Sequence, residues 1–113
     1  MVGHLLFKNI DPDQPATLSK ILLTDILQNE LNYKGLIITD DMNMLHTSTK
    51  ISVKDSLEKS INAGVDIVLY VGIPTSKENI LDALTGLIEN NDISAERVNS
   101  SLLKILTTKR ELK

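Results

Sequence analysis

The sequence predicts an α/β fold in which three parallel strands alternate with three to four helices. Three short apolar runs, at residues 1–7, 36–39 and 67–71, are separated by longer segments with apolar residues at helical spacing. The central run is apolar or β-branched at every position, which is typical of a strand buried on both faces of a parallel sheet. Alternation of strands and helices also indicates right-handed crossover connections.

Each element follows from a local pattern. Prolines and aspartates in KNIDPDQPAT indicate a loop, and either Thr17 or Ser19 is available to cap the helix after it. Gly64 stands where a helix-ending residue is expected, and Ser94 suits the start of the last helix. In chain order we expect strand 1–7, helix 18–31, strand 36–39, loop 41–52, helix 53–63, strand 67–71, loop 72–76, helix 77–90 and helix 95–109.

Composition narrows the class of protein. Hydrophobic residues make up 42% and charged residues 24% of the 113 residues, which is ordinary for a globular domain. The formal net charge is −3 without a basic stripe, so nucleic acid is not an expected partner. Without cysteine, disulfides and thiolate metal sites are excluded. The N-terminal apolar run is too short for a membrane span or a signal peptide, and localisation stays open.

The strongest candidate for chemistry is the pair Asp40 and Asp41, directly after the second predicted strand. Reactive groups gather at the C-terminal ends of parallel strands. The first strand contributes His4, whereas the third ends without a carboxylate or an imidazole. Successive strand residues face opposite sides. One aspartate is therefore expected to be reactive and the other to orient the loop.

Three other interpretations of the aspartate pair are possible from the sequence. An acid at a strand end is often only a helix cap or a solvated loop residue. A metal site would need further oxygen ligands, which the neighbouring sequence does not offer, so no metal is expected. A phospho-accepting aspartate of a receiver-type domain would need further acids at the end of the first strand, where MVGHLLF has none.

Structural roles are expected for several other polar or flexible side chains. His4, alone in an apolar strand, is expected to be packed or hydrogen-bonded, and His46, in a polar loop, to be solvated. Met42 and Met44 are the kind of residue that fills a core, although Met44 is also suited to a pocket wall. Asp66 is expected to tether the turn that leads into the third strand.

Five segments follow one another along the chain: GHLLF, DPDQPATLS, GLIITDDMNM, NAGVDIVLYV and ISAERVNSSLLKIL. In this order and spacing they resemble the later part of the catalytic barrel of glycoside hydrolase family 3, on its β-N-acetylhexosaminidase branch. DPDQPATLS and TDDMNM are the most specific, and the AG-D and ER-S elements are structural. The resemblance implies that residues 1–113 are the C-terminal segment of the barrel. A complete (β/α)8 TIM barrel needs about 250 residues, so the chain would be a partial one.

The resemblance also implies roles for three residues. The aspartate that ends the TD element is the family's nucleophile, and Asp40 matches it. Met44 matches a residue close to the sugar, and His4 matches a histidine near the floor of the site, so both are substrate-binding candidates. The family's lysine–histidine and histidine–aspartate elements, which bind the sugar and supply the acid/base, are absent from this sequence.

The implied function is part of a retaining glycoside hydrolase that removes terminal β-linked N-acetylglucosamine without a cofactor or metal. Its expected partners are N-acetylglucosamine-containing glycans such as cell-wall muropeptides or chitin oligomers. We expect the isolated chain to be inactive, and to associate with itself or with the missing barrel half. The alternative is a non-catalytic small α/β module that binds a sugar or a protein.

Overall fold

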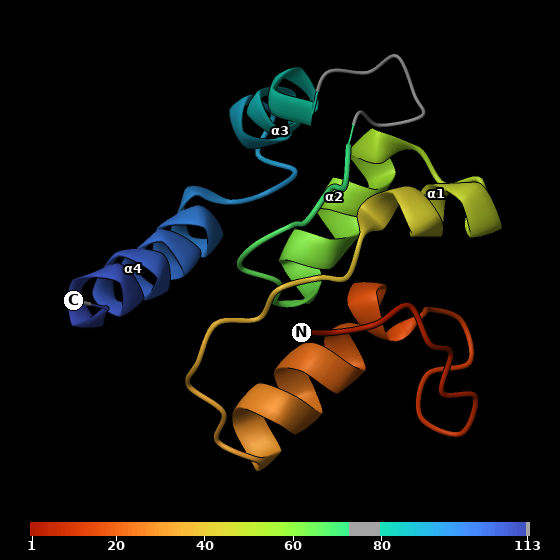
Figure 1. Ribbon diagram of the computed structural model, residues 1–113, viewed down its shortest axis with the longest axis horizontal. Coiled ribbons are helices and arrows are strands. Elements are labelled where there is room, and N and C mark those ends of the chain that lie inside the picture. The colour runs from red at the N-terminus through yellow and green to blue at the C-terminus, as the bar shows by residue number, and fades with distance from the viewer. Residues whose placement is uncertain (73–79, 113) are drawn as a thin grey trace.

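The computed structural model describes residues 1–72 and 80–112 as helices joined by extended segments (Figure 1). In chain order the helices are the 3₁₀-helix η1 (Ala16–Leu18), the π-helix η2 (Ile21–Glu30) and the α-helices α1 (Met42–Thr49), α2 (Val53–Ala63), α3 (Ile80–Glu89) and α4 (Ala95–Glu111). None of the helices within the described ranges has the length and hydropathy that crossing a bilayer requires.

The three predicted strands do not form a sheet. The expected α/β fold, a partial (β/α)8 TIM barrel with three parallel strands, is therefore wrong for the described residues, which are mainly helical. The three extended segments are joined by two isolated parallel bridges, one between Val2 and Thr39 and one between Ile38 and Ile67. The segments thus keep their expected order and direction, with the second between the first and the third, but single bridges do not make strands.

Side chains interrupt the ladder that the sequence predicts. The N–H of Leu69 donates to Thr39 Oγ1 at 2.9 Å, and the N–H of Val71 donates to Asp41 Oδ1 at 3.0 Å. In a parallel sheet these N–H groups would bind main-chain carbonyls at regular intervals. Because side-chain oxygens take them instead, the second and third segments lie together without a continuous ladder.

Ser19, one of the two predicted caps, lies two residues before helix η2 and binds its first turn. Ser19 Oγ accepts a hydrogen bond from the N–H of Leu22 at 3.1 Å and donates to Asp11 Oδ2 at 2.6 Å. The second bond ties the proline-rich loop to the start of the helix. At the other end, the N–H of Leu31 reaches the carbonyl of Ile26 at 2.9 Å, the five-residue spacing of a π-turn.

Helix α1 lies where the sequence predicts a loop, so that prediction is wrong. Asp41 caps the helix by accepting a hydrogen bond from the N–H of Asn43 at 3.0 Å. Met42 and Leu45 are buried on one face, and Lys50 ends the helix in a left-handed conformation with φ of 61°. A helix of eight residues contains only about two turns. Its apolar periodicity is therefore too short to recognise among polar residues.

Helix α2 agrees with its predicted boundaries. Ser52 Oγ accepts a hydrogen bond from the N–H of Asp55 at 3.0 Å, and Gly64 ends the helix with φ of 128°. That backbone conformation favours glycine because it has no Cβ. Val53 and Leu57 are buried and pack against α3 and the segment after it.

The core consists of three apolar clusters that share one residue. The first lies between η2, the end of α2 and the extended segments; the second joins α2 to α3; and the third packs η1 against α1. Val68, on the third extended segment, packs against all three. The extended segments therefore lie at the centre of the packing, although they form no sheet.

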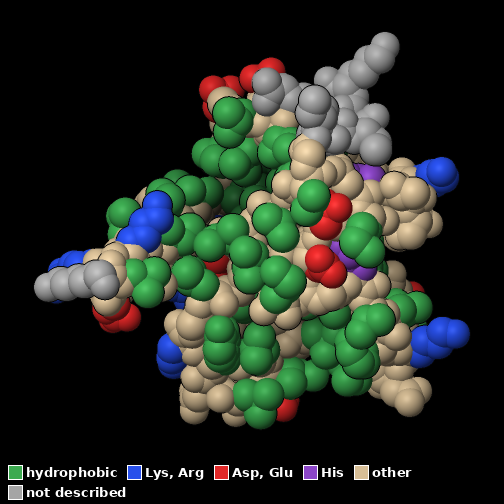
Figure 2. Space-filling view, viewed as in Figure 1, with side chains coloured by type: hydrophobic (Ala, Val, Ile, Leu, Met, Phe, Trp, Pro, Cys, Tyr) green, Lys and Arg blue, Asp and Glu red, His purple; other side chains and the backbone are tan. Residues whose placement is uncertain are grey.

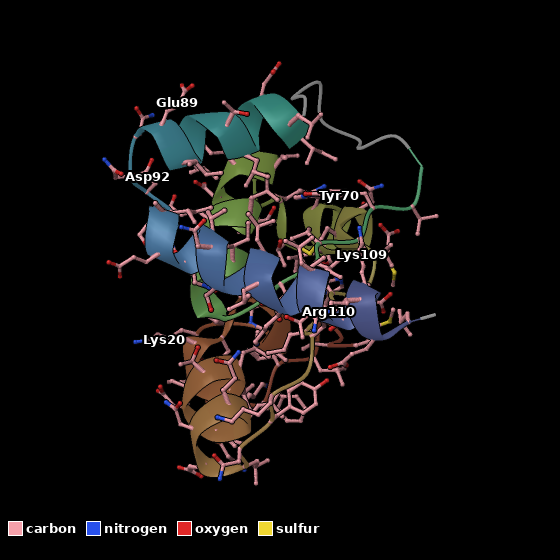
Figure 3. All side chains as sticks on the ribbon, turned by 90° about the vertical axis from the view of Figure 1, so that its left-hand side faces the viewer. Lys20, Tyr70, Glu89, Asp92, Lys109 and Arg110 are labelled. Carbon is pink, nitrogen blue, oxygen red and sulfur yellow. The ribbon has the colours of Figure 1, made fainter. Side chains whose placement is uncertain are left out.

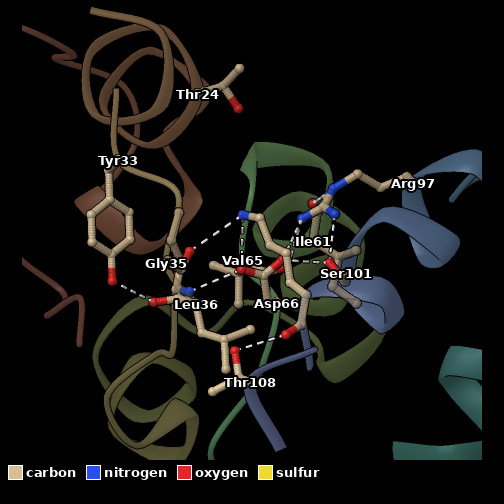
Figure 4. A network of polar contacts seen from close by, with 12 residues as sticks. Thr24, Tyr33, Gly35, Leu36, Ile61, Val65, Asp66, Arg97, Ser101 and Thr108 are labelled. Carbon is tan, nitrogen blue, oxygen red and sulfur yellow. Dashed lines mark hydrogen bonds and ion pairs between the residues drawn. The ribbon is translucent and has the colours of Figure 1, made fainter. Parts of the chain in front are cut away.

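Asp66 has the structural role that the sequence predicts (Figure 4). Its side chain is 1% exposed and accepts hydrogen bonds from the N–H of Ile37 at 2.9 Å and from Ser101 Oγ at 2.6 Å. Lys104 and Arg97 form ion pairs with it at 3.4 and 3.9 Å. Burial lowers the pKa of the Arg97 guanidinium, and the charge of Asp66 opposes that shift. Asp66 thus ties α4 to the second extended segment.

Helix α4 begins at the predicted cap, where Ser94 Oγ accepts a hydrogen bond from the N–H of Arg97 at 3.1 Å. Its last turn carries Lys109 and Arg110 (Figure 3), whose positive charges complement the negative end of the helix dipole. The described part of α3 confirms most of the helix predicted at 77–90. Residues 73–79, which hold most of the predicted loop and the start of that helix, lie outside the described residues.

Candidate active site

The extended segments bring His4, Asp40 and Asp41 to one place. The N–H of Asp40 donates to the carbonyl of Val2 at 2.9 Å, which holds the end of the second segment against the first. His4 Nε2 lies 2.8 Å from the carbonyl oxygen of Asp41. Figure 2 shows acidic and histidine side chains close together on this face, surrounded by hydrophobic side chains. The polar groups predicted from two separate segments therefore form one cluster.

Asp41 orients the chain at this cluster. Its Oδ1 accepts two hydrogen bonds at 3.0 Å, from the N–H of Asn43 and from the N–H of Val71. The first bond caps α1, and the second anchors the end of the third segment. Asn43 Nδ2 also donates to the carbonyl of Val71 at 2.9 Å. The carboxylate of Asp41 is thus engaged in holding main-chain groups.

Asp40 is less engaged than its neighbour. Its Oδ1 accepts a hydrogen bond from the N–H of Asp41 at 2.8 Å, and the residue is partly exposed. Its carboxylate makes no other hydrogen bond or ion pair with the described residues. One oxygen is thus held by the main chain while the other is available to a ligand.

Both ring nitrogens of His4 are in contact with protein atoms. Nδ1 lies 2.7 Å from Thr17 Oγ1, and Nε2 lies 2.8 Å from the Asp41 carbonyl oxygen. Thr17, in η1, is fully buried, and its hydroxyl also reaches the carbonyl of Gly3 at 3.0 Å. The expectation that His4 is a hydrogen-bonded residue is confirmed, and its bonds connect η1 with the start of α1.

Met44 lies on the exposed face of α1, with 57% of its surface accessible. It lines an open depression of about 430 Å³ that Asp41 also borders. The depression is bordered by Asp41, Asn43, Met44, Thr47 and Ser48. Met42, two residues earlier, is fully buried and fills the core as expected. Of these two methionines, Met44 is therefore the one whose side chain borders the depression beside Asp41.

A second hollow, of about 420 Å³, is separate from the aspartates. It lies between the N-terminal segment, η2 and the start of the second segment, and apolar side chains such as Leu5, Phe7 and Leu27 dominate its lining. Among the described residues, none of those that border it carries a carboxylate or an imidazole. The hollow can receive apolar groups and lies apart from the two aspartates.

His46 is not solvated, so that prediction is wrong. It is 7% exposed, lies on α1, and its Nδ1 is 2.9 Å from the carbonyl oxygen of Ile51. Its ring stacks on Tyr70 with the ring centroids 5.9 Å apart. The error follows from the missed helix, because α1 turns this histidine toward the third segment.

The loop before η1 contains an aspartate whose role the sequence analysis missed. Asp11 accepts hydrogen bonds from Ser19 Oγ at 2.6 Å and from the N–H groups of Asp13 and Gln14 at 3.2 Å. The hydrogen bond from Ser19 is the main reason that the pKa of Asp11 lies below its usual value, and the two N–H groups add to the effect. The sequence signal was available, since Asp before Pro-Asp is typical of such a turn.

A metal centre is not formed by the side chains that the structure describes. Within residues 1–72 and 80–112, no group of three or more histidine, aspartate or glutamate side chains is placed to hold a metal ion. The carboxylate of Asp41 is instead bound to main-chain N–H groups. The geometry is thus that of a carboxylate site held by the main chain.

Comparison with known proteins identifies the family. Residues 1–108 match the family that is described as "Glycosyl hydrolase family 3 N terminal domain". The chain belongs to glycosyl hydrolase family 3. The match extends over nearly all of the 113 residues, which confirms the resemblance drawn from the motifs.

Several proteins similar to this chain are β-hexosaminidases or β-N-acetylglucosaminidases. A β-hexosaminidase of Nitrosomonas eutropha is 36% identical over 84 residues, which cover 74% of this chain and 24% of that protein. The crystal structure of CbsA from Thermotoga neapolitana has a TM-score of 0.85 and 32% identity, over 98% of this chain and 25% of that one. The β-N-acetylglucosaminidase of Thermotoga maritima has a TM-score of 0.82 and 28% identity, over 93% and 23%. This family 3 chain therefore spans about a quarter of these relatives.

Proposed function

We propose that this chain supplies the nucleophile of a retaining β-N-acetylhexosaminidase, and that Asp40 is that nucleophile. The general acid/base and the remaining sugar-binding groups would lie outside these 113 residues. The proposal extends to this chain the activity in the names of several of its relatives, the β-hexosaminidases and β-N-acetylglucosaminidases.

The observation that supports Asp40 most directly is the difference between the two adjacent aspartates. Asp41 uses its Oδ1 on the N–H groups of Asn43 and Val71, whereas Asp40 accepts only the N–H of Asp41 among the described residues. A nucleophile needs an oxygen that can approach the anomeric carbon. Asp40 has such an oxygen, and the capping role of Asp41 explains why two aspartates are adjacent.

In the proposed reaction, a carboxylate oxygen of Asp40 attacks the anomeric carbon of a terminal N-acetylglucosamine residue. The bond to the glycosidic oxygen breaks, and an acid outside this chain protonates that leaving oxygen. Water then attacks the same carbon, releases the sugar and restores the Asp40 carboxylate, while the outside group takes the proton from the water. No cofactor enters this sequence of steps. Met44 would contact the sugar from the depression beside α1.

Covalent trapping tests the assignment. Residues 1–108 would replace the matching segment of the Thermotoga maritima β-N-acetylglucosaminidase, so that the host supplies the acid/base. A slow fluorinated N-acetylglucosaminide should then label Asp40, as found by peptide mapping. An Asp40→Asn variant should take no label, whereas Asp41→Asn, the matched control, should still be labelled at Asp40. Label on Asp41 or on a host peptide would contradict the proposal. A folded chimera that binds N-acetylglucosamine without taking label would favour the non-catalytic module.

A further inference from the structure

We infer that His4 is a positioning residue, which holds Asp41 so that its N–H keeps the Asp40 carboxylate oriented. This inference rests on the proposed function, because it takes Asp40 as the nucleophile. It assigns His4 a role through main-chain geometry, without contact to the sugar.

The contacts form a continuous path from η1 to the nucleophile. Thr17 Oγ1 lies 2.7 Å from His4 Nδ1, and His4 Nε2 lies 2.8 Å from the carbonyl oxygen of Asp41. The N–H of Asp41 then donates to Asp40 Oδ1 at 2.8 Å. Each link is a hydrogen bond of ordinary length. A shift of the His4 ring therefore displaces the residue that orients the nucleophile.

The proton on His4 Nε2 is fixed by its partner. A main-chain carbonyl can only accept a hydrogen bond, so Nε2 must carry a proton and donate to Asp41. Nδ1 faces Thr17 Oγ1, which can donate to the ring or accept from it while donating to the carbonyl of Gly3 at 3.0 Å. Under either arrangement both ring nitrogens are bound to protein. No ring nitrogen is left to bind a sugar hydroxyl.

The anchor of His4 is rigid. Thr17 is fully buried in η1, and the loop before it is held by Asp11, which accepts hydrogen bonds from Ser19 and from two main-chain N–H groups. Asp41 is equally constrained, since its side chain binds the N–H groups of Asn43 and Val71. His4 thus bridges two fixed points. Through these two contacts His4 links the DPDQPATLS segment to the TDDMNM segment.

Kinetics of the chimeric enzyme described above test this role. His4→Ala should lower kcat by about 10- to 100-fold, because a displacement of the order of 1 Å at a reacting group costs up to about 100-fold in rate. The KM for an aryl N-acetylglucosaminide and the inhibition constant of N-acetylglucosamine should not change, because His4 does not touch the sugar. His4→Gln should recover most of the rate, since the glutamine amide can donate to the Asp41 carbonyl. Thr17→Val should show a weaker form of the same kcat loss, and Thr17→Ser should not.

His46 provides the matched control. It is also a hydrogen-bonded histidine, with contacts to the Ile51 carbonyl and the Tyr70 hydroxyl, and within the described part of the chain none of its hydrogen bonds reaches Asp40. His46→Gln should lower the melting temperature and leave kcat per folded molecule unchanged. A rise in KM or in the inhibition constant for His4→Ala, with kcat kept, would show direct sugar contact and overturn the inference. Equal kcat for His4→Ala and wild type would overturn it as well. Failure of the proposed function itself would be recognised separately, by trapping label on a residue other than Asp40.

Discussion

Two chemically identical neighbours, Asp40 and Asp41, are distinguished by main-chain geometry. Asp41 has the non-helical φ of −56° and ψ of 115° of a helix cap, and its carboxylate turns back onto the N–H groups of α1 and of Val71. The alternation of strand side chains was enough to predict that only one of the pair orients the loop. Spacing alone could not show which of the two aspartates orients the loop, because the answer depends on helix α1, which was not predicted. The family resemblance selected Asp40.

Asp11 leads to a prediction about stability in acid. Its pKa is lowered in the folded protein, chiefly by the hydrogen bond from Ser19. A carboxylate with a lowered folded-state pKa contributes stability above its unfolded pKa, and that contribution is lost as pH falls through the folded value. The loss should therefore appear below about pH 4, the unfolded pKa of an aspartate. Asp11→Asn should lower the melting temperature at pH 7 and reduce its decrease in acid, as followed by circular dichroism.

A neighbouring aspartate serves as the control for this measurement. Asp13 is exposed, and its carboxylate accepts no hydrogen bond from the described residues. Asp13→Asn should leave the acid dependence of the melting temperature close to that of the wild type. If Asp11→Asn and Asp13→Asn behaved alike, the hydrogen bonds of Asp11 would not be the source of the effect.

At the scale of elements, the sequence predicts best what is encoded locally. Helices α2 and α4 were placed correctly because each has a serine cap and a regular apolar stripe, and α2 also has the glycine that ends it. Strand pairing depends on segments far apart in the sequence. The apolar run at 36–39 indicates a buried segment, but it does not indicate which other segment pairs with it. Thr39 Oγ1 and Asp41 Oδ1 take N–H groups of the third segment, and no periodicity reveals such a substitution.

The attachment of α4 depends on Asp66, which gives a second stability prediction. Asp66→Ala would leave the N–H of Ile37 without its acceptor and would remove the carboxylate that pairs with Arg97 and Lys104. Removing one member of a buried ion pair costs about 3–5 kcal/mol. That is a large part of the ~5–15 kcal/mol by which a domain is typically stable. Urea unfolding should therefore show a marked fall in the free energy of unfolding.

Asp25 is the matched control for Asp66. It is an exposed aspartate on η2, and Asp25→Ala should change the free energy of unfolding by no more than about 0.5 kcal/mol, as is usual for surface substitutions. A small effect of Asp66→Ala, similar to that of Asp25→Ala, would mean that α4 is held by its apolar contacts and not by the polar network of Figure 4.

For the whole molecule, the chain spans only about a quarter of the length of these relatives, so we ask whether it can be active alone. Retaining hydrolysis needs two carboxyl groups about 5 Å apart on either side of the scissile bond. Asp41, the carboxylate beside Asp40, is bound to main-chain N–H groups and is not placed to act as the acid. Loss of a general acid/base alone removes about 10²–10⁴-fold of rate.

We therefore expect the isolated chain to show no measurable hydrolysis of a chromogenic N-acetylglucosaminide. The Thermotoga maritima β-N-acetylglucosaminidase, assayed at the same molar concentration, is the positive control. Turnover by the isolated chain that disappears in Asp40→Asn would contradict the prediction, and would show that an acid within these 113 residues completes the site.

The isolated chain is also expected to self-associate, because it exposes large apolar side chains in several places. Leu5, Val71 and Leu103 are 66%, 65% and 69% exposed, and the apolar hollow beside the N-terminal segment adds further surface. The N–H groups of Gly3 and Leu5 donate to no acceptor among the described residues, so this segment also offers an edge for pairing. Contiguous apolar patches of more than a few hundred Å² are rare on soluble monomers.

Light scattering after size exclusion should give a mass above 12.5 kDa that rises with concentration. Leu5→Lys and Leu103→Lys should reduce that mass, whereas Thr107→Lys, at an exposed polar position of α4, should not. A 12.5 kDa monomer at high concentration with a sharp unfolding transition would show that the helices and extended segments bury enough apolar surface for the chain to be stable alone.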